Sequence, residues 1–472
     1  MRSFRTLETF NIRRRVPMKD LRGGPTDKRW YFLCGVLLLL GIILHQPLLI
    51  VVGILLLLIL LIIDVWAFYC LNDLYYRRSF SEQNVLFGEE VTLSLAIENA
   101  KLLPLPWLEV EDTIPRALTI KGQKLPGGRR KDMVALESLF STRWYERVTR
   151  RYTLQCNARG VHTFGPTKLR SSDIFGFVSR EMELSNREYL LVYPLVAPLY
   201  SFGLPARHPF GDRRAQQRLL EDPLRVAGVR DYSYGDSLRR VNWKASARAM
   251  QLQSKVYEST TTHTLVLFLN IVSQLDIYYG IRPDLQELSI CATASIADWA
   301  LDEGYAVGLY TNTLMFLPEE GAEQHAGESG GSNRPDAATS RLDRRRIRLP
   351  ASSHREQRRR IMEVLARIQS FFGSSIEDVL QTERTRLPAG STVVLVTSML
   401  SEQLIDILSR IYQNGHSVTV LFVGDNPPPL KLASIPIYHI GGETTWQAFV
   451  EAYSKTTDEQ AGMFQSSPGF HL

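Results

Sequence analysis

The residues of this 472-residue chain that are best suited to binding chemistry are crowded between positions 230 and 248. Several cations lie close in sequence to two carboxylates there, Asp231 and Asp236, beside aromatic side chains. An arginine guanidinium can bind a carboxylate or a phosphate through two parallel hydrogen bonds, so this cluster could bind a phosphate or an acidic loop of a partner. The candidate docking motif consists of Arg230, Tyr232, Gly235, Asp236, Arg239, Arg240, Asn242, Trp243, Lys244, Ser246 and Arg248.

The same segment also has a purely structural interpretation, as a latch. The residues Gly235-Asp236-Ser237 form a turn that can open a helix, with Asp236 or Ser237 as the N-cap. In that case Asp236 pairs with an arginine, and Trp243 packs the segment against the next domain. Catalysis by the motif is a third interpretation, and it is weaker because no nucleophile with a neighbouring base is evident.

Composition narrows the classes of function. The formal net charge of +6 is local, since residues 1–29 hold nine basic and three acidic side chains and the remainder is balanced. We therefore expect no nucleic acid partner. The cysteines are too few and too scattered for a disulfide framework or a Cys-rich zinc site, and we expect neither a cofactor nor a metal. They are Cys34, Cys70, Cys156 and Cys291.

A long apolar stretch near the start of the chain is typical of a membrane-spanning segment. From Trp30 to Ile63 there are 34 residues without Asp, Glu, Lys or Arg, which exceeds a single span of about 20 residues. Pro47 disfavours helix at Gln46, so the stretch predicts helices at 30–44 and 48–70, joined as a transmembrane hairpin over 30–71. A single tilted span and a secretory signal peptide are the alternatives.

Charge around this hairpin predicts its orientation. Cationic flanks remain in the cytoplasm, and basic residues lie both in the arm 1–29 and at Arg77-Arg78. A hairpin keeps both flanks on one side. We therefore expect a multi-pass protein of the cell membrane, in contact with the lipid bilayer, with cytoplasmic N- and C-termini.

Residues 78–200 have the pattern of an all-β domain. Apolar residues alternate with small or polar ones from Val91 to Ile97, as in a half-buried strand. Further short runs are separated by Pro and Gly. This spacing predicts a sandwich-like domain, followed by the motif segment at 201–258.

Residues 259–455 predict a different architecture. Apolar strands such as 265–269, 392–396 and 417–422 alternate with helices at about 284–303, 355–370 and 401–413, as in a doubly wound α/β domain. Residues 318–345 interrupt it as a flexible insert, and 456–472 form a tail. The arginine-rich stretch 341–360 is interpreted as a solvated basic face, with anionic lipid as an alternative partner.

At the docking motif the chain resembles the domain of unknown function 58 family of membrane-anchored bacterial and archaeal proteins. The shared pattern is R-x-Y-x-x-G-D-x-x-R-x-[IV]-[ND]-W-K-A-S-A-R, followed by a K-x-[YF]-E strand at 255–258. The resemblance extends to other positions along the chain. These are Arg78-x-Phe80, Phe87-Gly88-Glu89, Asp112-x-x-Pro115, Arg159-Gly160 and Asp173-x-Phe175-Gly176.

The resemblance implies that the α/β domain is similar to a von Willebrand factor A domain. Such domains hold Mg²⁺ through D-x-S-x-S and later loop residues. Here the corresponding positions are Asn270, Val272 and Gln274, with Ser398 after the strand at 392–396. Both carboxylates are replaced, so we expect a degenerate metal site without tight Mg²⁺ binding, on a domain that serves as a platform for protein interactions.

The function implied by this resemblance is that of a membrane-anchored, non-enzymatic adaptor. Its expected partner is a MoxR-type AAA+ ATPase, with a transglutaminase-like membrane protein as a second candidate. Its role would be assembly or maturation of envelope or metalloprotein complexes. The alternatives are a lipid or envelope-polymer binder, which exposed aromatic residues on the β-rich domain would favour, and an uncharacterised enzyme that uses the motif.

Overall fold

The chain forms two compact units, residues 1–192 and 193–472. Gly235, Gln274, the insert 318–345, the tail and most of the basic arm lie outside the residues that the computed structural model describes. Those residues are 28–122, 132–172, 178–204, 221–234, 236–259, 263–272, 282–315, 346–372, 374–428 and 435–453.

The apolar stretch folds into two helices, α1 (Lys28–Ile43) and α2 (Pro47–Tyr69). As predicted, the helices break at the proline, which occupies the first turn of α2, where its missing N–H costs nothing. The Tyr31 hydroxyl of α1 donates to Asp64 Oδ2 of α2 at 2.5 Å. Among the described residues, α2 is the helix long and apolar enough to cross a membrane, whereas α1 is shorter.

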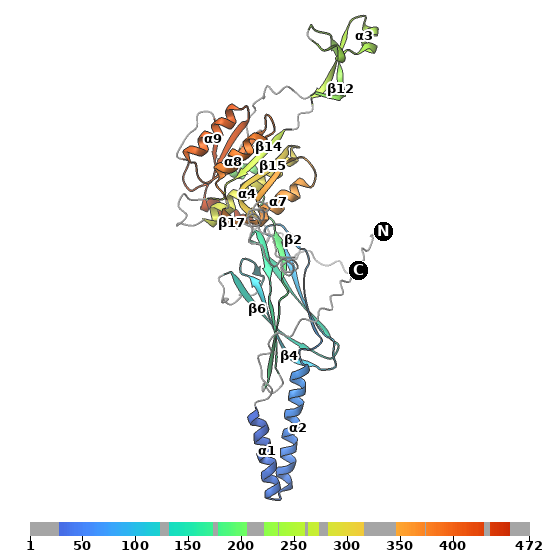
Figure 1. Ribbon diagram of the computed structural model, residues 1–472, viewed down its shortest axis with the longest axis vertical. Helices are drawn as coiled ribbons and strands as arrows, with labels where there is room; N and C mark the ends of the chain where they lie inside the picture. Colours follow the sequence, from blue (N-terminus) through green and yellow to red (C-terminus); the bar gives the residue numbers. More distant parts are fainter. Residues whose placement is uncertain are drawn as a thin grey trace, which may run out of the picture. The chain divides into compact units, whose positions relative to one another are not determined.

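The remainder of the first unit is all β, as predicted (Figure 1). One sheet has the order β1 (Leu74–Phe80), β3 (Glu90–Asn99), β7 (Arg147–Gln155), β5 (Thr119–Ile120). A second has the order β10 (Ser179–Leu184), β9 (Thr167–Ser172), β4 (Leu105–Pro115), β6 (Met133–Thr142). The third has the order β2 (Asn84–Val85), β11 (Glu188–Val192), β8 (Gly160–Phe164). The alternating side chains of β3 and β4 point into one apolar core with those of the other strands.

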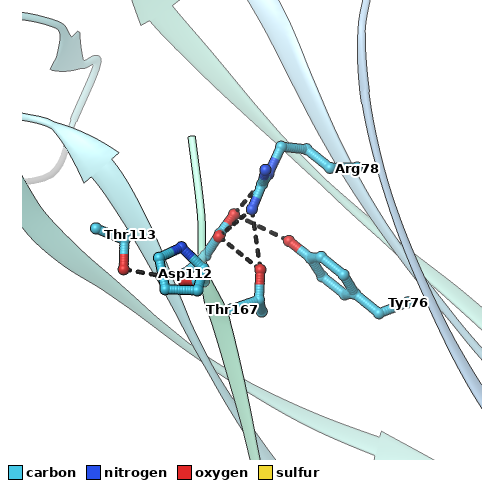
Figure 2. A network of polar contacts seen from close by, with 6 residues as sticks. Tyr76, Arg78, Asp112, Thr113 and Thr167 are labelled. Carbon is cyan, nitrogen blue, oxygen red and sulfur yellow. Dashed lines mark hydrogen bonds and ion pairs between the residues drawn. The ribbon is translucent and has the colours of Figure 1, made fainter. Parts of the chain in front are cut away.

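A buried polar network joins two of these sheets (Figure 2). Arg78 on β1 faces Asp112 on β4, and both side chains are almost fully buried. Arg78 Nε donates to Asp112 Oδ2 at 2.9 Å, and Arg78 Nη2 bonds Asp112 Oδ1. The hydroxyls of Tyr76 and Thr167 each donate to the same carboxylate at 2.9 Å.

This network satisfies each buried charge with several partners, as a buried ion pair requires. Burial alone would lower the pKa of Arg78. Asp112, with Tyr76 and Glu188, outweighs burial and raises that pKa above its usual value. Burial and the same carboxylate raise the pKa of the Tyr76 phenol. Arg78 therefore stays charged and Tyr76 neutral at physiological pH.

The second unit begins with a short segment tied to its α/β core. Ala197 N donates to Ser295 Oγ at 2.9 Å, and Phe202 of η1 (Leu199–Phe202) meets Phe449 edge-on. The hairpin that carries the docking motif comes next in the chain. It consists of β12 (Glu221–Asp231), η2 (Leu238–Arg240), α3 (Trp243–Ala249) and β13 (Gln253–Ser259).

The rest of this unit confirms the predicted sheet with helices on both faces (Figure 1). Strands follow the order β16 (Arg346–Ser352), β15 (Ala306–Met315), β14 (Thr264–Leu269), β18 (Thr392–Thr397), β19 (Ser417–Phe422), β20 (Ile437–His439). All neighbours from β15 to β20 are parallel, and β16 is antiparallel. The strand β17 (Ile368–Phe372) pairs with β15 off this path.

Helices α8 (Ile376–Glu383) and α9 (Glu402–Gln413) share one apolar core with alternate residues of β14, β18 and β19. Helices α4 (Pro283–Asp302) and α7 (Gln357–Arg367) contact each other and other strand positions, and η4 (Arg384–Arg386) follows α8. The predicted helix over 355–370 was too long, because from Ile368 the chain leaves α7 to pair with β15.

Candidate functional site

The docking motif is built on the antiparallel hairpin of β12 and β13. Arg230 pairs with Ser254, and Asp231 with Gln253, across β12 and β13. Between the strands, Asn242 Oδ1 accepts from Ala245 N at 3.2 Å and so caps α3. The sequence had indicated Asp236 or Ser237 as the cap; instead Ser237 precedes the short 3₁₀ turn η2, and its side chain makes no capping hydrogen bond.

Hydrogen bonds hold this hairpin in shape. The Ser246 hydroxyl donates to Asn242 O and accepts from Gln253 N, both at 2.9 Å. The carboxylate of Asp231 accepts from the side-chain amide of Gln253 at 2.6 Å. The Ser246 contacts thus hold α3 against β13.

Asp236 is held within its own turn. Its Oδ1 accepts from Arg230 Nη2 at 2.7 Å, and its Oδ2 accepts from Ser233 N at 3.0 Å. Both contacts lower the pKa of Asp236, the backbone bond most strongly. The Tyr232 hydroxyl donates to Asp236 O at 2.9 Å. The arginine partner expected for Asp236 is therefore Arg230, and this part of the latch interpretation is correct.

The other part of the latch interpretation, packing of Trp243 against the next domain, stays a prediction. The indole is 68% exposed, and several other apolar side chains of the hairpin are exposed with it. The cations Arg239, Lys244 and Arg248 are exposed as well, and Arg240 is half-buried. We define the docking surface as the exposed residues Tyr234, Leu238, Arg239, Trp243, Lys244, Arg248 and Met250.

Asn242→Ala tests how far the cap determines this shape. Loss of the bond to Ala245 N leaves a helix donor without its partner, so we expect the free energy of unfolding to fall by about 1 kcal/mol. Thermal melting of the full-length protein in detergent measures the effect. Asn242→Asp keeps an acceptor at the cap and is the matched control; equal losses for both variants would contradict the capping role.

Asn270 and Val272, described residues at which the resemblance predicted a degenerate metal site, contribute to a neutral hydrogen-bonded network. Asn270 follows β14, and its Nδ2 donates to Thr397 Oγ1 at 3.0 Å. Its Oδ1 accepts from Asn312 Nδ2 at 2.8 Å and from Val272 N at 3.1 Å. The Thr397 hydroxyl in turn donates to Met399 O at 2.8 Å. These side chains use their polar atoms on one another rather than leaving them for a cation.

Sequence reasoning identified part of this network. Val272 takes part through its backbone N–H, and Thr397 rather than the neighbouring Ser398 supplies the hydroxyl. Asn312 was missed, although the polar run Thr311-Asn312-Thr313 interrupts an otherwise apolar strand. Within the described residues no three His, Cys, Asp or Glu side chains are gathered as a metal site would need.

Comparison with known proteins bears on the motif segment. Residues 228–329, which include most of the hairpin and the first part of the α/β sheet, match the family described as "Protein of unknown function DUF58". The uncharacterized protein YeaD of Bacillus subtilis (strain 168) is 25% identical over 263 residues. That match covers 55% of this chain and 61% of YeaD, so the chain spans about three-fifths of this relative.

Solved structures give a much weaker likeness. A cohesin module from a Clostridium perfringens glycoside hydrolase is 10% identical, with a TM-score of 0.19, over 25% of this chain and 96% of that one. The sporulation control protein Spo0M of Bacillus subtilis is 10% identical, with a TM-score of 0.17, over 26% of this chain and 50% of its own. Likenesses at this level carry no argument about function.

Proposed function

We propose that this protein is a membrane-anchored, non-enzymatic adaptor that binds a protein partner through the docking surface. Helices α1 and α2 form the two-helix anchor in the cell membrane, with both termini in the cytoplasm. The α/β domain is von Willebrand factor A-like and has lost metal control. The observation that carries the proposal is the exposure of Trp243 within a hairpin whose shape is fixed by internal hydrogen bonds.

The composition of the docking surface supports binding to protein. An exposed aromatic residue on the same hairpin as exposed Leu, Met and Arg side chains gives a composition typical of interface hot spots, where Trp, Tyr and Arg dominate the binding energy. Asp236 is already paired with Arg230, whereas the acceptors for Arg239, Lys244 and Arg248 would come from a partner. An acidic loop next to an apolar pocket is the surface that complements this arrangement.

The partner that we propose is a MoxR-type AAA+ ATPase, on the basis of the family resemblance of the motif. A transglutaminase-like membrane protein is the second candidate. The complex would assemble or mature an envelope or metalloprotein complex. In this role the hairpin supplies recognition and the ATPase supplies the energy.

Trp243→Ala is the direct test of this function. Full-length protein in mild detergent is mixed with the MoxR-type ATPase of the same host, with and without ATP, and the dissociation constant is measured. Loss of a central indole costs about 2 kcal/mol or more, so we expect binding to weaken about 30-fold or more. Trp144→Ala, which removes another exposed indole from the first unit, is the matched control and should leave binding unchanged.

The outcomes of this experiment separate the alternatives. Weakened binding with an unchanged melting temperature supports the docking surface. Unchanged binding by Trp243→Ala would remove the docking surface from the proposal, and no binding by the wild-type protein would remove the ATPase as the partner.

A further inference from the structure

The end of the β-sandwich that follows α2 carries its own cluster of exposed apolar side chains. Register places this end where β1 begins and β3 stops, because Leu74 pairs with Asn99. Two loops meet there, residues 100–104 and 143–146. Tyr145 N donates to Lys101 O at 3.2 Å, and Asn99 Nδ2 donates to Leu103 O at 2.9 Å and to Arg143 O at 2.8 Å.

These bonded loops hold large apolar side chains out in solvent. Leu102 is 71% exposed, Trp144 64% and Tyr145 66%. Tyr145 has a φ of 49°, a left-handed conformation that is unusual for a bulky residue. Arg143 and Arg147 lie exposed beside them, while the carboxylate of Glu146 accepts from Arg143 N at 2.6 Å. Exposed apolar side chains next to cations in ordered loops suit a partner that offers both an apolar phase and negative charge.

The position of these loops beside the end of α2 indicates the depth at which they would lie in a bilayer that α2 spans. A cavity of about 330 Å³ is lined by Val65 and Tyr69 of α2 and by Leu102 and Leu103 of the first loop. The Lys101 ammonium donates to Cys70 O and Asn72 O, just after α2. Leu102 therefore lies level with the last turn of α2. The 23 residues of α2 span roughly 34 Å, about the thickness of the hydrocarbon core of a bilayer. If Pro47 lies at one polar boundary of the bilayer, the last turn of α2 therefore reaches the opposite boundary.

We propose that this end of the sandwich, formed by Leu102, Arg143, Trp144, Tyr145 and Arg147, inserts into the interfacial layer of the bilayer that α2 spans. Trp and Tyr rings favour this layer because it accepts an apolar body and a polar edge. The arginines lie where they meet lipid phosphates. The inference rests on insertion of α2, and it adds a lipid-contacting surface that is independent of the docking surface.

Depth-dependent quenching tests the proposal in the full-length chain. The four native cysteines are buried, so a cysteine introduced at an exposed position can be labelled selectively with an environment-sensitive fluorophore. Labels at Trp144→Cys and Leu102→Cys are compared in vesicles of phosphatidylcholine and phosphatidylglycerol that contain a headgroup-proximal nitroxide lipid. We expect blue-shifted emission and quenching several-fold stronger than at Leu86→Cys.

Two controls make each outcome decisive. Leu86 is 55% exposed and lies just before β3, at the opposite end of that 10-residue strand, about 30 Å away. Leu55→Cys, read in matching vesicles that carry the nitroxide on the lipid acyl chain, reports on α2 itself, because residue 55 lies about 12 Å along the helix from Pro47. Quenching at Leu55→Cys, with water-like emission at both loop positions, would overturn the surface but leave the anchor intact. If Leu55→Cys is not quenched either, the anchor and the inference both fail.

Discussion

Asp112→Ala is expected to lower the free energy of unfolding of the first unit by about 3–5 kcal/mol, because it strands a buried arginine. Arg78 would lose both bonds to the carboxylate, keeping only the Thr167 hydroxyl at 2.9 Å among its hydrogen-bond partners in this network. The Tyr76 hydroxyl loses its acceptor as well. Urea unfolding of the full-length protein in detergent, followed by near-ultraviolet circular dichroism, measures the loss.

Two companion variants show whether the stranded charge is the cause. Glu137→Ala removes an exposed carboxylate from β6 and should change stability by no more than about 0.5 kcal/mol. The double variant Arg78→Met/Asp112→Leu removes both charges and fills the space, so it should recover most of the loss. A double variant as unstable as Asp112→Ala would show that the network contributes something that apolar packing cannot replace.

Asn270→Asp is expected to destabilise the α/β domain by about 2–4 kcal/mol at neutral pH, because it introduces a charge into a buried neutral network. The Asn270 Nδ2 donor to Thr397 Oγ1 would become an oxygen facing another acceptor. Burial raises the folded-state pKa of the new carboxyl above its unfolded value of about 4. The folded state then binds the proton more tightly, so the loss is small in acid and grows as pH rises.

Melting curves at several pH values, with and without Mg²⁺, measure this effect. Asn426→Asp, which creates the same carboxylate at an exposed position of the same unit, is the control and should show little change. We expect Mg²⁺ to give no recovery, because Asn312 and Thr397 supply only neutral oxygens. Recovery by Mg²⁺ would mean that one carboxylate restores a metal site.

Much of the fold follows from short-range pattern. Period-2 alternation predicted β3, continuous apolar runs predicted β14, β18 and β19, and Pro47 marked the break between the two helices. The end of α7 could not be predicted in this way. Ile361, Leu365 and Ile368 continue a helical period, but pairing of Met315 with Ile368 across the sheet decides the conformation there.

The sites were harder to predict because they depend on partners far away in the chain. Arg78 and Asp112 were noted separately as parts of a shared pattern, and only the fold brings them together across two sheets. The role of Asn312 required the register of β15 beside β14. The exposure of Trp243 depends on what packs against α3, and helical spacing contains no information about that.

The junction between α2 and β1 has a consequence for orientation. Only residues 70–73 separate the helix from the strand, a length that cannot exceed about 14 Å. Lys101 binds two carbonyls within it, so the β-rich domain has little freedom to rotate about α2. If α2 spans a bilayer as proposed, the rotational freedom of the β-rich domain about this helix has already been lost on folding, and insertion of its loops into the interfacial layer costs correspondingly less entropy.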